Sequence, residues 1–257
     1  VTTTCGITPF PYFESFESIT AANTLPTCMA STSLGTNVTT NLSGTTYNRI
    51  ARTGSKSASY RWASSEYIFT PSFNFTAGYN YQVSFWYIAD GIAGFDSIVT
   101  RYGASQSAAG MTTLVGSPVL SPVNTTYAQW TGTFTPTSTG ANYSGIKVAS
   151  ASSSPWYITI DDISVQVLST IVTSTSSMAF GNVNVGLNST TPFTVSGNSL
   201  VPASGNITIA APTGYQVSTS SSSGFADSIT VPYTGSSLST TTIYARFAPG
   251  SVGAFGG

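Results

Sequence analysis

The stretch WYITIDDISVQV, residues 156–167, decides the fold class of this chain. Apolar and polar residues alternate along it, as they do in a β-strand that turns one face to a core. The alternation slips by one residue at Asp161–Asp162, so the apolar residues before and after this pair fall on opposite faces. These residues are Ile158 and Ile160 before the pair, and Ile163, Val165 and Val167 after it. A β-bulge at the pair would return all five to the core side.

Short alternating runs continue along the chain, whereas long stretches with the period of an amphipathic helix do not. The runs before residue 168 are 79–89, 96–103, 127–136, 144–150 and 156–167. The runs after it are MAFGNVNVG, PFTVSGNSL, GNITIAAPTGYQVS, DSITVPYTG and TTIYARFAPGSVG. So many short strands predict two β-sandwich domains, residues 1–168 and 169–257, with the boundary near Ser169–Thr173. We expect the second domain to lack its last strand or strands.

The composition limits the function classes that need to be considered. The net charge is −1 and 6% of the residues are charged, so no basic patch predicts a nucleic-acid partner. Hydrophobic residues make up 40% of the chain, which is enough to form a core and argues against disorder. The sequence contains neither a run of 18 apolar residues nor a signal-peptide pattern.

Histidine is absent from the chain. A Ser-His-Asp or Cys-His arrangement therefore cannot form, and zinc sites that need imidazole are excluded. The remaining chemistry is that of carboxylates, hydroxyls, aromatic rings and cations bound by oxygen. We do not expect an enzyme.

The only two cysteines are Cys5 and Cys28. In a Ser- and Thr-rich, Lys-poor chain with the composition of an exported protein, we expect them to form a disulfide. Closing this loop would stabilise the fold by about 3 kcal/mol through the unfolded state. The alternative is a pair of buried thiols.

The stretch FESFESITAANTLPTC, residues 13–28, places Glu14 and Glu17 beside phenylalanines. A buried carboxylate is costly unless it is paired, and the chain has only 7 Lys and Arg residues. Calcium, which binds oxygen ligands, could satisfy these acids together with Asp161 or Asp162. The alternatives are that the aspartates lie in a solvated turn, or that two carboxylates hydrolyse glycosides, which we consider the weaker interpretation.

Four stretches resemble the choice-of-anchor J domain, a jelly-roll module of bacterial surface proteins related to meprin-type and carbohydrate-binding jelly rolls. They are FESFESITAANTLPTC (13–28), ARTGSKSASY (51–60), YNYQVSFWY (79–87) and ITIDDISV (158–165), in the expected order. The chain departs from the family at LPTCMAS, where a Trp usually follows LP. The resemblance implies a jelly roll over residues 1–168. It also implies a structural calcium bound by Glu17, by the turn from Gly54 to Lys56, and by Asp161 or Asp162.

Residues 170–257 resemble the immunoglobulin-like repeats of large secreted proteins from Bacteroidota. The matching strings are FGNVNVG, FTVSGNSL, APTGYQVSTSSSSGF and IYARFAPGSVGAFGG. This resemblance implies type IX secretion, a place on the cell surface and contact with adjacent repeats of a longer chain. The tripeptide DSI, at 96–98 and 227–229, is similar to the O-glycosylation motif of Bacteroidota and makes Ser97 and Ser228 candidates for modification.

Our first functional hypothesis is a non-catalytic extracellular adhesin, or a filament or stalk fragment, that attaches to glycans or to cell and solid surfaces. The alternative is a carbohydrate-binding module of a larger secreted polysaccharide-degrading enzyme. Such modules bind sugars through exposed aromatic side chains. The candidates are Trp62, Trp86, Trp130 and Trp156. We expect Trp62 to be the exposed glycan contact, and Trp86 and Trp130 to lie in the core.

Overall fold

The structure is a computed structural model that describes residues 5–41 and 46–255. Within these ranges the chain consists of β-strands and loops, and its helical structure is one 3-10 turn, η1, at Thr46–Asn48. The predicted all-β fold class is therefore confirmed. In the described residues no helix has the length and apolar character needed to cross a membrane.

The chain divides into two compact units, with the division between Val167 and Leu168. The sequence places this boundary one residue later. Thr170–Thr173, which the sequence assigns to the boundary region, forms strand β12 of the second unit.

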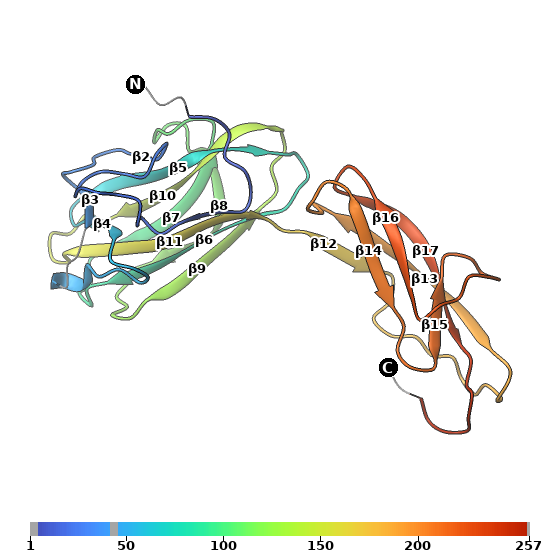
Figure 1. The fold of residues 1–257 in the computed structure, drawn as a ribbon. Coiled ribbons are helices and arrows are strands. Elements are labelled where there is room, and N and C mark those ends of the chain that lie inside the picture. Colours follow the sequence, from blue (N-terminus) through green and yellow to red (C-terminus); the bar gives the residue numbers. More distant parts are fainter. Residues whose placement is uncertain (1–4, 42–45, 256–257) are drawn as a thin grey trace. The chain divides into compact units, whose positions relative to one another are not determined.

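The first unit is a sandwich of two antiparallel sheets (Figure 1). One sheet has the order β3-β4-β11-β6-β9, with β1 also paired to β11, and the other has the order β2-β5-β10-β7-β8. If β4 to β11 are numbered one to eight, these orders contain 1-8-3-6 and 2-7-4-5. Successive strands thus alternate between the sheets except for β7 and β8, which pair with each other, and this is the order of a jelly roll.

The strand bounds of the first sheet are β1 Tyr12–Glu14, β3 Val38–Asn41, β4 Ser57–Arg61, β6 Tyr81–Ala89, β9 Ala128–Phe134 and β11 Tyr157–Val167. Those of the second are β2 Ala30–Ser31, β5 Ser65–Phe75, β7 Ser97–Gly103, β8 Thr113–Leu120 and β10 Gly140–Ala149.

Strand β11 contains the predicted bulge. Asp161 lies opposite Trp86 of β6, and the next paired residue is Ser164, which lies opposite Ser84. Asp162 has a φ of 51°, in the left-handed region. The apolar residues on both sides of the bulge are fully buried: Ile158, Ile160, Ile163 and Val165.

The bulge also marks a change of partner along one edge of β11. Residues 157–160 pair with β4, and residues 163–165 pair with β1. The two aspartates thus lie between these two ladders. A loop that approaches this edge from outside can therefore accept hydrogen bonds from, or donate them to, the strand at this point.

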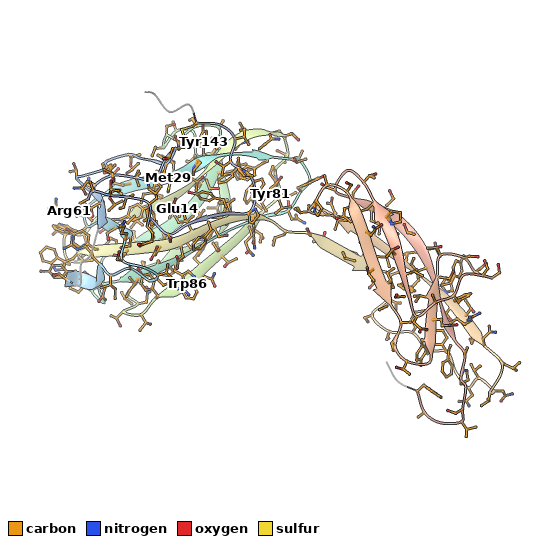
Figure 2. The ribbon with its side chains drawn as sticks, viewed as in Figure 1. Glu14, Met29, Arg61, Tyr81, Trp86 and Tyr143 are labelled. Carbon is orange, nitrogen blue, oxygen red and sulfur yellow. A yellow bond between two sulfur atoms is a disulfide. The ribbon has the colours of Figure 1, made fainter. Side chains whose placement is uncertain are left out.

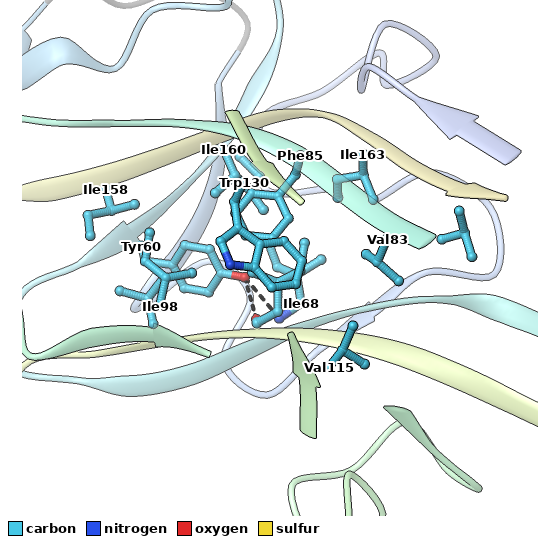
Figure 3. Packing of buried hydrophobic residues seen from close by; sticks show 14 of the residues in the cluster. Tyr60, Ile68, Val83, Phe85, Ile98, Val115, Trp130, Ile158, Ile160 and Ile163 are labelled. Carbon is cyan, nitrogen blue, oxygen red and sulfur yellow. Dashed lines mark hydrogen bonds between the residues drawn. The ribbon is translucent and has the colours of Figure 1, made fainter. Parts of the chain in front are cut away.

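The core of the first unit fills the space between its sheets (Figure 3). Phe73 and Phe85 are among its fully buried aromatic residues, and Tyr60 of β4 also lies in this core. The Tyr60 hydroxyl donates to the carbonyl oxygen of Ile146 at 2.6 Å and accepts from the N–H of Ile68 at 3.2 Å. A side chain of one sheet thus hydrogen-bonds to the backbone of two strands of the other.

The second unit is a smaller sandwich. One sheet has the order β12-β13-β17-β15 and the other pairs β14 with β16. Their bounds are β13 Ser189–Asn198, β14 Gly205–Ala210, β15 Tyr215–Ser218, β16 Ser228–Tyr233 and β17 Leu238–Phe247, with β12 as given above. Val195 of β13, Val231 of β16 and Ile243 of β17 are buried in one cluster, so both sheets contribute to one core.

Two details of the strand predictions need correction. The stretch MAFGNVNVG, residues 178–186, forms no strand, and most of its residues are exposed. The strand prediction also lacks β1 to β5, β8 and β12; in β8, Gly116 and Pro118 interrupt the pattern.

Candidate functional site

Glu17 holds the loop that precedes β4. Its Oε1 accepts the backbone N–H of Ser55 at 2.9 Å and that of Lys56 at 2.7 Å. The Nζ of Lys56 donates in return to the carbonyl oxygens of Glu17, at 2.8 Å, and Ile19, at 2.6 Å. The N–H of Ser55 donates to the carboxylate and lowers the pKa of Glu17, and Lys56 adds to this effect.

The aspartates of the bulge hold the start of the same loop. Asp161 Oδ2 accepts the backbone N–H groups of Arg52 at 2.8 Å and Thr53 at 3.2 Å. Asp162 forms an ion pair with Arg52 at 2.6 Å and accepts the Thr53 hydroxyl at 2.5 Å. Asp161 is fully buried, and this burial raises its pKa to about 7. We call Arg52–Lys56 the clamped loop, because acids from two segments hold it.

The residues that the resemblance assigns to calcium therefore surround one loop. Their carboxylate oxygens, however, accept N–H and O–H groups of that loop, and the ammonium of Lys56 binds the nearby carbonyl oxygens. Calcium needs oxygen lone pairs that face a common point. In the described part of the chain, no three acidic, His or Cys side chains come together to hold a metal. This arrangement does not fit a calcium ion, and metal removal is the experiment that tests the site that the resemblance implies.

Glu14 has a different role from Glu17. It lies in β1, half-buried, and its Oε1 accepts the N–H of Phe16 at 2.6 Å. Phe16 has a φ of 62°, so this bond supports a left-handed turn at a fully buried residue. Burial raises the pKa of Glu14.

The structure joins Cys5 to Cys28 by a disulfide, with the two Cα atoms 5.6 Å apart. The bridge closes a segment that contains β1 and both glutamates. The segment is therefore closed on itself by the disulfide, and it is fixed to the sandwich by β-pairing with β11 and by Glu17.

A group of aromatic and arginine side chains lies where β4 ends and β11 begins. We call it the aromatic end cluster, and its members are Tyr47, Arg49, Arg61, Trp62, Trp156 and Tyr157. Figure 2 labels Arg61 at this end of the first unit. The cluster joins residues from η1, from the end of β4 and from the start of β11, which are far apart in the sequence.

Trp156 lies at the centre of the ring contacts in the cluster. Tyr47 stacks on Trp156 at 4.6 Å between ring centroids, and Trp62 meets Trp156 edge to face at 4.7 Å. Arg61 lies 4.0 Å from the Trp62 ring centre, and Arg49 lies 4.3 Å from that of Tyr157. Both are cation–π contacts.

Backbone bonds fix the segments that carry these rings. The N–H of Trp62 donates to the carbonyl oxygen of Trp156, whose own N–H donates to Asp90 Oδ2. Asn48 Nδ2 donates to the carbonyl oxygen of Ala89 at 2.8 Å and ties η1 to the end of β6. The cluster is therefore held by main-chain contacts that do not depend on the exposed ring faces.

Exposure differs within the cluster. Tyr47 is 42% exposed, whereas the other five side chains are half-buried. Tyr47 stacks on Trp156 and lies 6.4 Å from the Tyr157 ring, and at 42% exposure part of the residue reaches solvent. The sequence pointed to Trp62 but missed Tyr47 and Arg49. The signal in the sequence was an isolated Tyr between polar residues in NLSGTTYNRI, outside any strand pattern.

The other two tryptophans lie elsewhere. Trp130 is 7% exposed in the core, as predicted, and its Nε1 donates to the carbonyl oxygen of Ser117. The expectation that Trp86 is a core residue is wrong. Trp86 is half-buried on the outer face of β6, and the guanidinium of Arg52 lies 3.8 Å from its ring centre. Its strand has aromatic residues on both faces, so alternation alone could not place it.

The candidate glycosylation sites are each the first residue of a strand. Ser97 begins β7, where it is half-buried and paired on both sides. Ser228 begins β16 and is exposed. Modification of either serine stays a prediction, and Ser228 is the more accessible of the two.

The second unit contains a cavity of about 280 Å³. Its lining includes Met178, Phe180, Phe193 and Ile209, and no charged side chain. These residues also pack against the core of that unit. The cavity offers no charged group for catalysis or for binding an ion.

No model of a known protein family matches the chain, and no curated protein matches it either. Among solved structures, it is similar to the K1 cleaved adhesin domain of Lys-gingipain from Porphyromonas gingivalis W83, with 14% identity, a TM-score of 0.44, and coverage of 62% of this chain and 98% of that one. It is also similar to the CBM22-1 xylan-binding domain of Paenibacillus barcinonensis Xyn10C, with 11% identity, a TM-score of 0.41, and coverage of 61% and 92%. The C-terminal CBM6 of LamC from Zobellia galactanivorans gives 15% identity, a TM-score of 0.37, and coverage of 61% and 98%. Identities and TM-scores this low support no conclusion about function.

Proposed function

We propose that the chain is part of a non-catalytic extracellular surface protein of the adhesin type, and that its first unit binds glycans through the aromatic end cluster. The single observation that carries the proposal is an exposed tyrosine stacked on a tryptophan in a cluster of four aromatic rings with two arginines. The C–H face of a sugar ring packs on an aromatic face, and a hydroxyl or N–H group near the ring can bind the sugar's hydroxyls.

Preorganisation also supports the proposal. A binding surface loses less free energy on association when its side chains already occupy one conformation. Here the rings pack against one another, and their backbone segments are tied to β6 and β11. Arg49 Nε donates to the carbonyl oxygen of Thr46, which helps to hold η1.

The acidic residues support a non-catalytic role. Seven of the eight carboxylates in the chain accept hydrogen bonds from other parts of the protein. These seven are Glu14, Glu17, Glu66, Asp90, Asp96, Asp161 and Asp162. Their contacts hold loops and strand ends, which is a structural use of carboxylates.

A disulfide between Cys5 and Cys28 fits an extracellular location, because such bonds persist in oxidising compartments. The resemblance to the choice-of-anchor J domain and to secreted repeats of Bacteroidota adds type IX secretion, adjacent repeats and O-glycosylation at Ser97 or Ser228 to the proposal. Mass spectrometry of the natural protein tests the last point, with modification expected first at Ser228.

The experiment is binding of the full chain to a panel of immobilised neutral and acidic polysaccharides, read out by affinity electrophoresis. Tyr47→Ala and Trp62→Ala should each weaken binding by about tenfold or more, because each removes a stacking or supporting ring. Phe13→Ala is the control, since Phe13 is 62% exposed and lies outside the cluster. Failure of the folded chain to bind any member of the panel would contradict the proposal.

The alternative is that the same cluster serves a carbohydrate-binding module of a larger secreted polysaccharide-degrading enzyme. Both versions need glycan binding by the first unit, and they differ in what the natural full-length protein does next. Hydrolysis of the bound polysaccharide by the natural protein would favour the enzyme version. Retention on the cell surface without hydrolysis would favour the adhesin.

A further inference from the structure

We propose that the aromatic end cluster prefers anionic glycans, whose carboxylate or sulfate groups bind Arg49 and Arg61. This inference rests on the proposed function and adds the charge class of the ligand. It follows from the partners of the arginines in the first unit and from those of Asp90, an acid that contacts the cluster.

The arginines of the first unit differ in their partners. Arg52 forms an ion pair with Asp162, which neutralises it. Within the described ranges, neither Arg49 nor Arg61 comes within ion-pair distance of a carboxylate. Each instead lies over an aromatic ring of the cluster. Two positive charges are thus held beside four aromatic rings in a chain with only 7 cationic residues.

A stacked guanidinium keeps its binding capacity. A guanidinium carries five N–H donors in a planar fork, and of those on Arg49 only Nε donates within the described residues, to the carbonyl oxygen of Thr46. These donors match the two oxygens of a carboxylate or of a sulfate in a bidentate arrangement. Stacking on Trp62 and Tyr157 also restricts both side chains, so less conformational freedom is lost on binding.

Asp90, the acid that contacts the backbone of the cluster, forms no ion pair with Arg49 or Arg61 among the described residues. Asp90 lies at the end of β6, and its two oxygens accept the N–H groups of Ile92 at 3.0 Å and Trp156 at 2.5 Å. Its carboxylate therefore fixes the loops beneath the cluster. The cluster thus combines the exposed residue Tyr47 with two guanidinium groups, which complements a sugar that carries a negative charge.

Matched pairs of polysaccharides test the inference, because the members of a pair differ only in charge. The pairs are polygalacturonate with its fully methyl-esterified form, and dextran sulfate with dextran. Binding of the full chain is measured by isothermal titration at low salt. We expect the charged member of at least one pair to bind about tenfold more tightly than its neutral twin, as one charge-assisted bidentate contact would give. The pair that responds distinguishes carboxylate from sulfate.

Variants locate the effect. Arg49→Gln and Arg61→Gln should each weaken binding of the charged member by a larger factor than binding of the neutral twin, and so reduce this advantage. Arg101→Gln is the matched control, since Arg101 lies on β7 and donates to the carbonyl oxygen of Thr112. Raising the salt concentration from about 0.05 to about 0.5 M should also reduce the advantage, because it screens exposed charges.

Each other outcome overturns the inference. Equal or tighter binding of the neutral twins, still dependent on Tyr47, contradicts the charge preference and leaves the proposed function standing. If Arg101→Gln reduces the preference for the charged polysaccharide as much as Arg61→Gln does, the preference comes from the overall positive charge and not from the cluster. If none of the four polysaccharides binds, the charge preference is contradicted. Glycan binding itself is contradicted only if no other polysaccharide of the immobilised panel binds either.

Discussion

Single carboxylates in this chain hold backbone amides in place. Glu17 accepts two consecutive N–H groups of the clamped loop, Asp161 accepts two more, and Glu14 accepts the N–H of a buried left-handed residue. Hydrogen bonds to a charged acceptor are about twice as strong as neutral ones. A chain with 8 acidic residues thus uses most of them to fix loops whose sequences contain few apolar anchors.

Gly54, in the middle of the clamped loop, lies against the Glu17 carboxylate and leaves no room for a side chain. Gly54 has a φ of +64°, and a Cβ atom there would lie 2.4 Å from the Glu17 carboxyl carbon. Gly54→Ala should therefore displace Glu17 and strain the backbone, and destabilise the protein by about 1–3 kcal/mol in urea unfolding.

Gly78→Ala distinguishes the cost of backbone strain from the cost of displacing Glu17. Gly78 has a φ of +79°, but a Cβ atom there would meet nothing within 4 Å. It should thus cost only the backbone strain. If both variants lose the same stability, the contact with Glu17 has no measurable effect.

At the residue scale, the sequence identified the acids but not their partners. Glu17, Asp161 and Asp162 stood out because acids are rare and lie beside aromatic residues or at a slipped alternation. The donors to Glu17 and Asp161 are backbone N–H groups of the clamped loop, which no side-chain pattern reveals, and those to Asp162 are the side chains of Arg52 and Thr53. An isolated Tyr among polar residues was the only sign of Tyr47, since a loop has no period that says which of its residues reach the surface.

At the scale of elements, β11 organises the first unit. It pairs with β4, then with β1, and along its other edge with β6. Its bulge keeps the apolar residues on the core side through this change of partner, and presents Asp161 and Asp162 to the clamped loop. The clamped loop before β4 is thereby held to the last strand of the first unit by aspartate side chains and not by β-pairing.

The clamped loop predicts how the protein responds to metal removal. Because its acids bind N–H groups, Arg52 and Lys56 directly, EDTA should leave the melting temperature of the full chain unchanged. Glu17→Gln should lower it, because the amide keeps the shape but loses the charge that the two N–H groups bind. A fall in EDTA that calcium reverses would contradict this account and support the calcium site implied by the family resemblance.

Tyr60 links the two sheets of the first unit. Its hydroxyl contacts the backbone of Ile146 and Ile68, and it is fully buried. Tyr60→Phe keeps the ring and leaves those contacts unmade, so it should destabilise the protein by about 1–3 kcal/mol. Tyr143→Phe, at a half-buried position, should change stability by less. Equal stability of the Tyr60 variant and the original chain would show that this link contributes nothing.

Element prediction succeeded where one face was apolar and the run was unbroken. β6, β7, β9, β10 and β11 were found from alternation. β5 was missed because seven consecutive residues, from Tyr67 to Phe73, are buried, and a strand buried on both faces does not alternate. MAFGNVNVG alternates but forms no strand, because alternation predicts a strand only where a neighbouring strand supplies hydrogen bonds.

For the whole molecule, the order of strands in the first unit could be anticipated only through a resemblance to a known module. Composition and period predicted β-sandwiches, but which strands pair depends on contacts between residues far apart in the sequence. The aromatic end cluster is such a contact, since it joins residues 47 and 49, 61 and 62, and 156 and 157. The central claim is that this cluster binds glycans.

The most direct test uses the four tryptophans as reporters in one NMR titration. The indole N–H signals are followed while an oligosaccharide from the most tightly bound polysaccharide of the panel is added. We predict shifts for Trp62 and Trp156, which belong to the cluster, and none for Trp130, which is buried, or Trp86, which lies under Arg52. Binding that shifts Trp86 or Trp130 and leaves Trp62 and Trp156 unchanged would contradict the account.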